Sequence, residues 1–112
     1  MPDERQSGLL RDMLDSARLI QGYVADTSPE MFFADTEKQD AVLRRLEIIG
    51  EAASRLSSES QALFPHLPFR GMRGMRNIIA HDYGEVDLDL VWKTATVDLV
   101  ALVQTLDRHF AE

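Results

Sequence analysis

Cysteine is absent from the 112-residue chain. The protein therefore has no disulfide, no thiolate metal ligand and no cysteine nucleophile. No apolar run approaches the ~20 residues that a transmembrane helix requires. The first residues, MPDERQSG, lack the apolar stretch of a secretory signal. These absences favour a cytoplasmic protein, because disulfides are rare in reducing compartments.

Several catalytic motifs are missing as well. The chain has no P-loop, no G-x-S-x-G and no glycine-rich dinucleotide turn. Positive charge is scarce, since the formal net charge is -7, and this argues against a duplex DNA binder with a basic face. The stretch from Pro65 to His81 is an exception, because it contains Arg70, Arg73 and Arg76 but no acidic residue. Such a local basic patch is able to bind a few phosphates.

Apolar residues recur at helical spacing in three long segments. A hydrophobic content of 45% and a length of 112 residues suit one folded domain, residues 1–112. No segment shows the alternation of a β-strand. We therefore expect an all-α, up-and-down helical bundle of four to five helices. Its three main stripes are Leu10, Met13, Ala17, Ile20 and Val24; Val42, Leu46, Ile49, Ala53 and Leu56; and Leu88, Trp92, Ala95, Leu99, Leu102 and Leu106.

Capping residues predict where the helices begin. Ser28 precedes a proline and should cap a short helix. Asp35 or Thr36 should cap the long second stripe, and Asp87 should cap the last one. The apolar stripes are wide for so short a chain, which leaves room for burial in a homodimer or within one bundle.

Two breaks separate the long helices. The stretch SSESQALFPHLPF contains two prolines and is expected to end the second long helix. A shorter helix should follow at about residues 70–81, and Gly84 should interrupt the chain after it. The apolar side chains that would attach this shorter helix to the bundle are Met72, Met75, Ile78 and Ile79.

Polar side chains cluster in RNIIAHDY, residues 76–83. Asn77 and His81 are four apart, so a hydrogen bond between them is feasible on a helix. Arg76 and His81 are five apart, about 140° around a helix, and meet only if the arginine swings toward the helix end. Arginine binds phosphate and histidine exchanges protons near neutral pH. Together they suffice for RNA cleavage by the ribose 2′-hydroxyl without a metal.

A purely structural interpretation of these residues is also open. Arg76 and His81 could cap the helix end and form a surface ion pair with Asp82. Tyr83 could be a core residue, although its charged neighbours favour exposure. Glu47 and Glu51, four apart on the long helix, form another candidate pair, of which Glu47 is expected to face water.

A metal-dependent interpretation rests on different residues. His81 and Asp82, with His66 and a later Asp98 or Asp107, superficially match the histidine–aspartate metal phosphohydrolases. No H-E-x-x-H or other tight ligand pair supports that interpretation. We therefore expect neither a metal nor another cofactor.

The spacing R-x-x-x-x-H, with a tyrosine two residues further on, occurs at Arg76, His81 and Tyr83. It resembles the motif of HEPN-domain ribonucleases, and specifically the HepT-like toxins of bacterial toxin–antitoxin pairs. RRLEIIGEAASRLS, from Arg44, resembles the long helix of that family with its Gly-Glu-Ala. LPFRGMRGMRNIIAHDYGEVDLDLVW resembles its motif region, with Phe69 in place of a common tryptophan.

The resemblance implies a site and partners. Such proteins dimerise and bring two motif copies into one cleft, which is a metal-independent endoribonuclease of a type VII-like toxin–antitoxin pair. Arg76 and His81 would be catalytic, with Asn77 and Arg73 supporting them. An MntA-like nucleotidyltransferase antitoxin would silence the cleft by transferring AMP to Tyr83. The alternative is a non-catalytic helical module that binds a nucleotidyltransferase or a nucleotide.

Overall fold

The computed structural model describes residues 2–111, apart from the side chain of Tyr83. Every regular element in this part of the chain is helical, which confirms the all-α bundle. None of the described helices combines the length and apolar character needed to cross a bilayer. The elements are α1 (Glu4–Val24), α2 (Pro29–Phe33), α3 (Thr36–Arg55), α4 (Ser58–Ala62), α5 (Phe69–His81), the 3-10 helix η1 (Tyr83–Glu85), α6 (Leu88–Lys93), the π-helix η2 (Thr94–Asp98) and α7 (Leu99–Ala111).

Side-chain caps begin the helices where the sequence predicts them. Ser28 accepts a hydrogen bond from the backbone N–H of Met31 at the start of α2. Asp35, rather than Thr36, caps α3, and Asp87 caps α6. Ser57 caps α4, a helix of five residues that the sequence pattern does not predict. This helix and the division of the last helix raise the number of described helices above the expected four to five.

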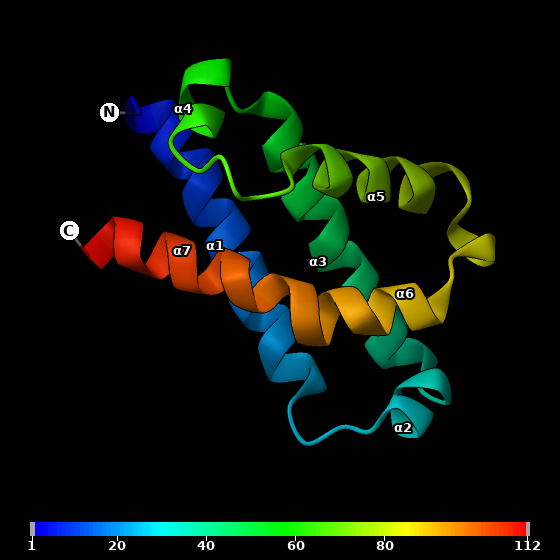
Figure 1. Ribbon diagram of the computed structural model, residues 1–112. Helices are drawn as coiled ribbons and strands as arrows, with labels where there is room; N and C mark the ends of the chain where they lie inside the picture. Colours follow the sequence, from blue (N-terminus) through cyan, green and yellow to red (C-terminus); the bar gives the residue numbers. More distant parts are fainter. Residues whose placement is uncertain (1, 112) are drawn as a thin grey trace.

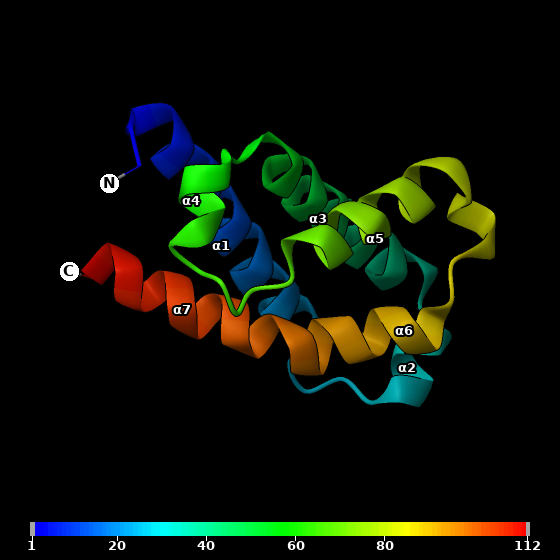
Figure 2. The same ribbon diagram turned by 45° about the horizontal axis from the view of Figure 1, so that its top comes forward.

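The helices form two crossing layers (Figure 1). Helices α1 and α3 pack side by side in opposite directions, α5 crosses α3, and α7 packs on α1. The core lies between these layers and confirms the first two predicted stripes, which are buried throughout. The chain turns back at η1, so that α5 and α6 run in opposite directions, as both views show (Figure 2).

The last stripe differs from the prediction at its beginning. Val91 is fully buried, whereas Trp92 is only partly buried and contacts the ring of Phe32, with 5.3 Å between the ring centroids. The π-helix Thr94–Asp98 explains the difference, because a π-turn contains one more residue than an α-turn and shifts the inward face by one position.

An apolar groove of about 390 Å³ separates α5 from α6 and α7. Ile78 lies on its α5 side and is 45% exposed, so the expectation that Ile78 attaches α5 to the bundle is wrong. Ile79, about 100° further around the helix, is buried and does this instead. The apolar walls of the groove also include Met72 and Met75 on α5, and Leu90, Leu99 and Leu102 opposite.

Gly50 allows α3 and α5 to approach closely. A Cβ atom at this position would lie 2.3 Å from the Cβ of Arg76 and 2.6 Å from the backbone oxygen of Met72. Both distances are shorter than carbon–carbon and carbon–oxygen contacts allow, so a side chain at Gly50 would push the helices apart. Glycine is therefore required here for space, and it determines how near Arg76 lies to α3.

Candidate active site on helix α5

Polar residues form an exposed strip along α5. Arg73, Asn77 and His81 are separated by four residues each and lie on one side of the helix, within about 80°. Asn77 and His81 are exposed and Arg73 is partly exposed. The hydrogen bond that the spacing of Asn77 and His81 makes feasible is absent from the described structure, and His81 ends the helix. These side chains are open to solvent and available to a ligand.

Arg76 lies at the edge of this strip and turns toward α3. Its side chain is 31% exposed, and one of its terminal nitrogens lies 3.4 Å from a carboxylate oxygen of Glu51. The Nε atom of Arg76 is buried without a hydrogen-bond partner among the described residues. The base of the side chain lies against Gly50 and its tip lies near Glu51, so the side chain follows two consecutive residues of α3.

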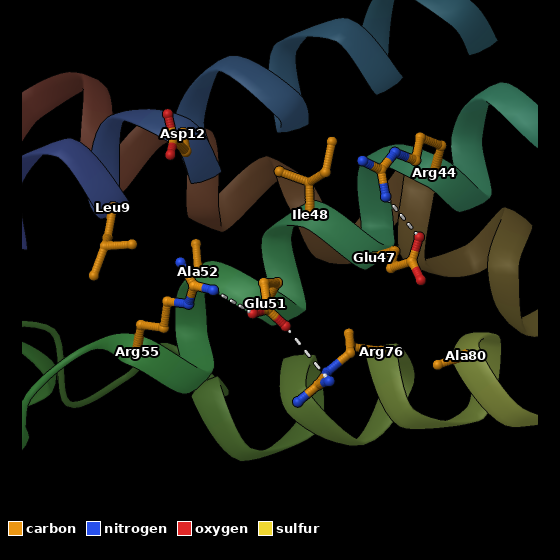
Figure 3. Close-up of a pocket in the computed structure, with 10 residues that line it drawn as sticks. All are labelled: Leu9, Asp12, Arg44, Glu47, Ile48, Glu51, Ala52, Arg55, Arg76 and Ala80. Atoms are coloured by element: carbon orange, nitrogen blue, oxygen red, sulfur yellow. Dashed lines mark hydrogen bonds and ion pairs between the residues drawn. The ribbon is translucent and has the colours of Figure 1, made fainter.

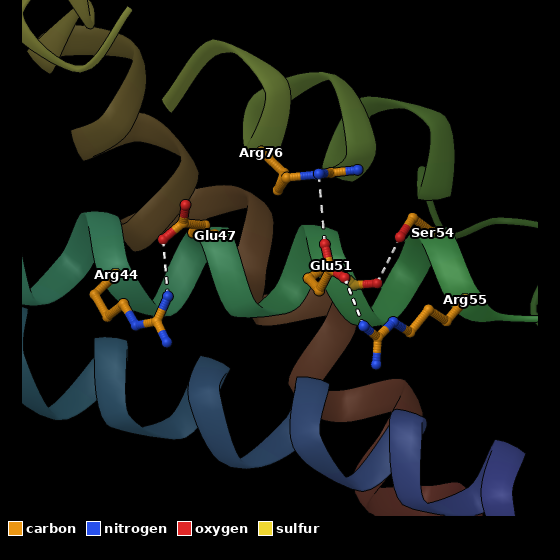
Figure 4. A network of polar contacts seen from close by, with 6 residues as sticks. All are labelled: Arg44, Glu47, Glu51, Ser54, Arg55 and Arg76. Carbon is orange, nitrogen blue, oxygen red and sulfur yellow. Dashed lines mark hydrogen bonds and ion pairs between the residues drawn. The ribbon is translucent and has the colours of Figure 1, made fainter. Parts of the chain in front are cut away.

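Glu51 also belongs to a second ion pair. Its other carboxylate oxygen lies 3.0 Å from a guanidinium nitrogen of Arg55, one turn further along α3. Figure 4 shows the carboxylate between the two arginines, while Glu47 pairs separately with Arg44 at 2.9 Å. The two glutamates are therefore not a carboxylate pair, and each is neutralised by arginine.

The structure places both Arg76 and His81 on α5, with His81 as its last residue and Arg76 near its middle, but does not join them. Arg76 contacts Glu51, and no hydrogen bond or ion pair of His81 occurs in the described part of the chain. Neither residue pairs with Asp82 there, which removes the structural interpretation based on that ion pair. A substrate that engages both residues of one chain must span the five residues of α5 that separate them.

The end of α5 places Tyr83 outside the helix that carries Arg76. The helix stops at His81, and a separate 3-10 helix begins at Tyr83. Arg76 and Tyr83 therefore do not share a continuous helical stripe. Gly84 does not break the chain with a positive φ, because it belongs to this 3-10 helix. The side chain of Tyr83 lies outside the described part of the structure, so its distance from Arg76 stays a prediction.

A polar pocket of about 270 Å³ lies beside Arg76, between α1, α3 and α5 (Figure 3). Its charges offset each other, because Asp12, Glu47 and Glu51 face Arg44, Arg55 and Arg76. His81 is not among the residues that line it. The pocket therefore contains only one member of the predicted catalytic pair, Arg76.

The metal-dependent interpretation finds no matching geometry. Three of the residues that it would recruit have partners elsewhere. His66 contacts the hydroxyl of Thr105 at 2.9 Å, and Asp107 pairs with Arg18. Asp98 pairs with Lys93 at 3.4 Å. Over residues 2–111, no three histidine, aspartate or glutamate side chains gather as a metal site would require.

Fold and motif together define a small all-α protein with an arginine–histidine motif in the second half of one helix. Comparison with protein families gives the same class, because the family described as "Ribonuclease HepT-like" matches residues 13–109. The chain therefore belongs to the HepT-like ribonuclease family.

Several curated proteins are similar over most of the chain. "Probable ribonuclease HepT" of Thermococcus cleftensis is 37% identical over 83% of this chain and 84% of its own length. "Putative RNase MJ0125" of Methanocaldococcus jannaschii is 31% identical over 96% of this chain and 93% of its own length. A longer protein of the same organism, "Gamma-glutamylcyclotransferase and putative RNase MJ0434", is 37% identical, and the chain covers 44% of it. No solved structure matches the chain significantly.

Two features of the site were missed by reasoning from the sequence. The close contact at Gly50 and the position of Glu51 between two arginines depend on how α3 and α5 cross. The Gly-Glu-Ala sequence entered the prediction only through the family resemblance. A glycine next to an acid, inside a long helix, is the signal that could reveal the contact.

Proposed function

We propose that the protein is a metal-independent endoribonuclease and the toxin of a type VII-like toxin–antitoxin pair. The observation that carries this proposal is an exposed His81 at the end of α5 and a partly exposed Arg76 five residues before it, in a HepT-like ribonuclease. Histidine is the residue type best suited to move protons near neutral pH, and arginine is suited to a phosphate.

The reaction follows from these two side chains. His81 accepts the proton of a ribose 2′-hydroxyl, whose oxygen then attacks the adjacent phosphorus. The new bond to the 2′-oxygen forms as the bond to the 5′-oxygen of the next nucleotide breaks, and that oxygen takes up a proton. Arg76 stabilises the charge that develops on the phosphate oxygens. Arg73 and Asn77 lie on the exposed strip and would hold neighbouring phosphates.

A second copy of the chain would complete the cleft. Arg76 and His81 of one chain do not touch, and the apolar groove beside α5 leaves Ile78 and Leu90 45% and 42% exposed. Exposed apolar surface of this kind is typical of protein interfaces. We propose that this groove contributes to a homodimer in which both motif copies face one RNA-binding cleft.

Tyr83 is proposed as the residue whose modification switches off the ribonuclease. An MntA-like nucleotidyltransferase antitoxin would join the tyrosine oxygen to the α-phosphorus of ATP and release pyrophosphate. The attached AMP carries a phosphodiester anion, which would compete with RNA for the positive charge of Arg76. Tyr83→Phe should keep ribonuclease activity and gain no AMP, as intact mass spectrometry after incubation with the transferase and ATP would show. Addition of AMP to this variant would contradict the assignment.

The Arg76–Glu51 ion pair supports one alternative, a non-catalytic helical module in which Arg76 is structural. Growth arrest on expression and RNA cleavage in vitro separate the two functions. In the catalytic case, His81→Ala abolishes both effects and keeps the thermal melt of the wild type. Cleavage in excess chelator tests metal independence. An unchanged cleavage rate in His81→Ala would remove the histidine from the mechanism.

A further inference from the structure

The Arg76 side chain is fixed at two points by α3. Near the backbone it rests against Gly50, where a Cβ atom would lie 3.1 Å from the Cγ of Arg76. At its tip, a terminal nitrogen lies 3.4 Å from Glu51. The Nε atom between these points is buried without a partner in residues 2–111. The orientation of the guanidinium group therefore depends on the carboxylate of Glu51.

Glu51 is itself held in place. Its second carboxylate oxygen lies 3.0 Å from Arg55, four residues away on the same helix. Each carboxylate oxygen thus contacts a guanidinium group (Figure 4). In this arrangement the carboxylate orients Arg76. Because both of its oxygens already contact guanidinium groups, it is poorly placed to accept a proton from RNA.

We propose that Glu51 is a positioning residue that orients the Arg76 guanidinium group toward the scissile phosphate. The inference rests on the proposed ribonuclease function. An arginine free to rotate would lose part of its effect, because stabilisation of developing charge requires donors that are already oriented. The pair contributes little to stability, since the Glu51 side chain is 43% exposed.

The negative charge of Glu51 distinguishes a positioning role from a role in RNA binding or folding. A carboxylate beside a phosphate-binding arginine opposes the binding of RNA in the ground state. Its removal should therefore slow the chemical step without weakening RNA binding. A loss of folding would instead lower the melting temperature and impair both steps.

The test measures kcat and KM for RNA cleavage in Glu51→Ala and Glu51→Gln. We expect Glu51→Ala to lower kcat about tenfold without raising KM, and to keep the melting temperature within about 4 °C. Glu51→Gln retains an oxygen that accepts a hydrogen bond, so its kcat should stay within about threefold of wild type. Glu47→Ala is the matched control, because Glu47 lies one turn earlier on α3 and pairs only with Arg44 among the described residues.

Binding is measured separately in the His81→Ala background, where RNA stays intact. Adding Glu51→Ala should leave the Kd for RNA unchanged or lower it. An unchanged kcat in Glu51→Ala, a tenfold rise of Kd, or a loss in Glu51→Gln as large as in Glu51→Ala would overturn the positioning role. Wild-type protein that cleaves no RNA would instead refute the proposed function.

Discussion

Helix α5 meets its neighbours in two different ways. Toward α3 it approaches so closely that Gly50 has no room for a side chain, and Arg76 is held there by Glu51. Toward α6 and α7 it borders an apolar groove of about 390 Å³, where Ile78 remains 45% exposed. On the α3 side, close packing positions the charge of Arg76. On the groove side, apolar surface remains uncovered.

Under the proposed homodimer, this difference separates what one chain does alone from what requires a second copy. The orientation of Arg76 is determined within the chain, by residues of α3. The groove is not filled by the described residues, although its walls are mainly apolar. We therefore expect substitutions on the α3 side to alter chemistry or folding, and substitutions on the groove side to alter assembly.

The largest effect is expected on the α3 side, from Arg76→Ala. Loss of this charge should lower RNA cleavage at least about 100-fold, the usual cost of removing one donor to a developing anion. The melting temperature should change little, because the ion pair to Glu51 is partly exposed. Arg5→Ala, which removes an exposed charge on α1, is the control for overall charge. An Arg76→Ala protein with full activity would contradict the catalytic role.

The groove side is tested by Ile78→Glu. A buried, unpaired carboxylate at an interface should raise the dimer dissociation constant about 100-fold or more and reduce cleavage with it. Sedimentation should then show mainly the 12.7 kDa monomer. Leu19→Glu on α1, at 42% exposure, should leave the assembly unchanged. A wild-type protein that is already monomeric at micromolar concentration would argue against the dimer.

The close contact itself is tested by Gly50→Ala. The added methyl group would lie 2.3 Å from the Cβ of Arg76, so α5 must shift. We expect a loss of about 1–3 kcal/mol in the free energy of unfolding, typical of overpacking. Gly8→Ala in α1 has nothing within 4 Å and should stabilise by about 0.5–1 kcal/mol. Chemical denaturation of both variants measures the contrast, and equal stabilities would show that the helices separate easily.

The smallest effect is expected from Arg55→Ala, which removes one of the two arginines that contact Glu51. Because Glu51 keeps its contact with Arg76, kcat should fall only about twofold to threefold. A loss as large as that of Glu51→Ala would mean that Arg55 has its own role with RNA.

The sequence predicts the helices well where local chemistry determines them. Ser28, Asp35 and Asp87 cap helices as expected, because a cap requires only a side chain and the next few backbone groups. Helix α4 was missed because its five residues lie just before two prolines, and a segment so short has no periodicity to detect.

The candidate site is less predictable because it depends on contacts between helices. Arg76 and His81 are visible in the sequence as a motif. The contact of Arg76 with Glu51 spans 25 residues of sequence and arises only because α3 and α5 cross at Gly50. Ile78 illustrates the same limit, because its apolar side chain predicted burial, whereas the groove leaves it exposed.

The π-helix at Thr94–Asp98 has a consequence for how this chain tolerates insertions and deletions. Its extra residue sets the rotation of α7 relative to α6, so that Val91 and Leu99 both face inward. Deleting one residue there would restore a regular α-helix and turn α7 by about 100° against α6. Leu102 and Leu106 would then point away from the core. A surface loop would tolerate a deletion of this length. At the π-helix, the same deletion would disrupt the packing of α7 against the core.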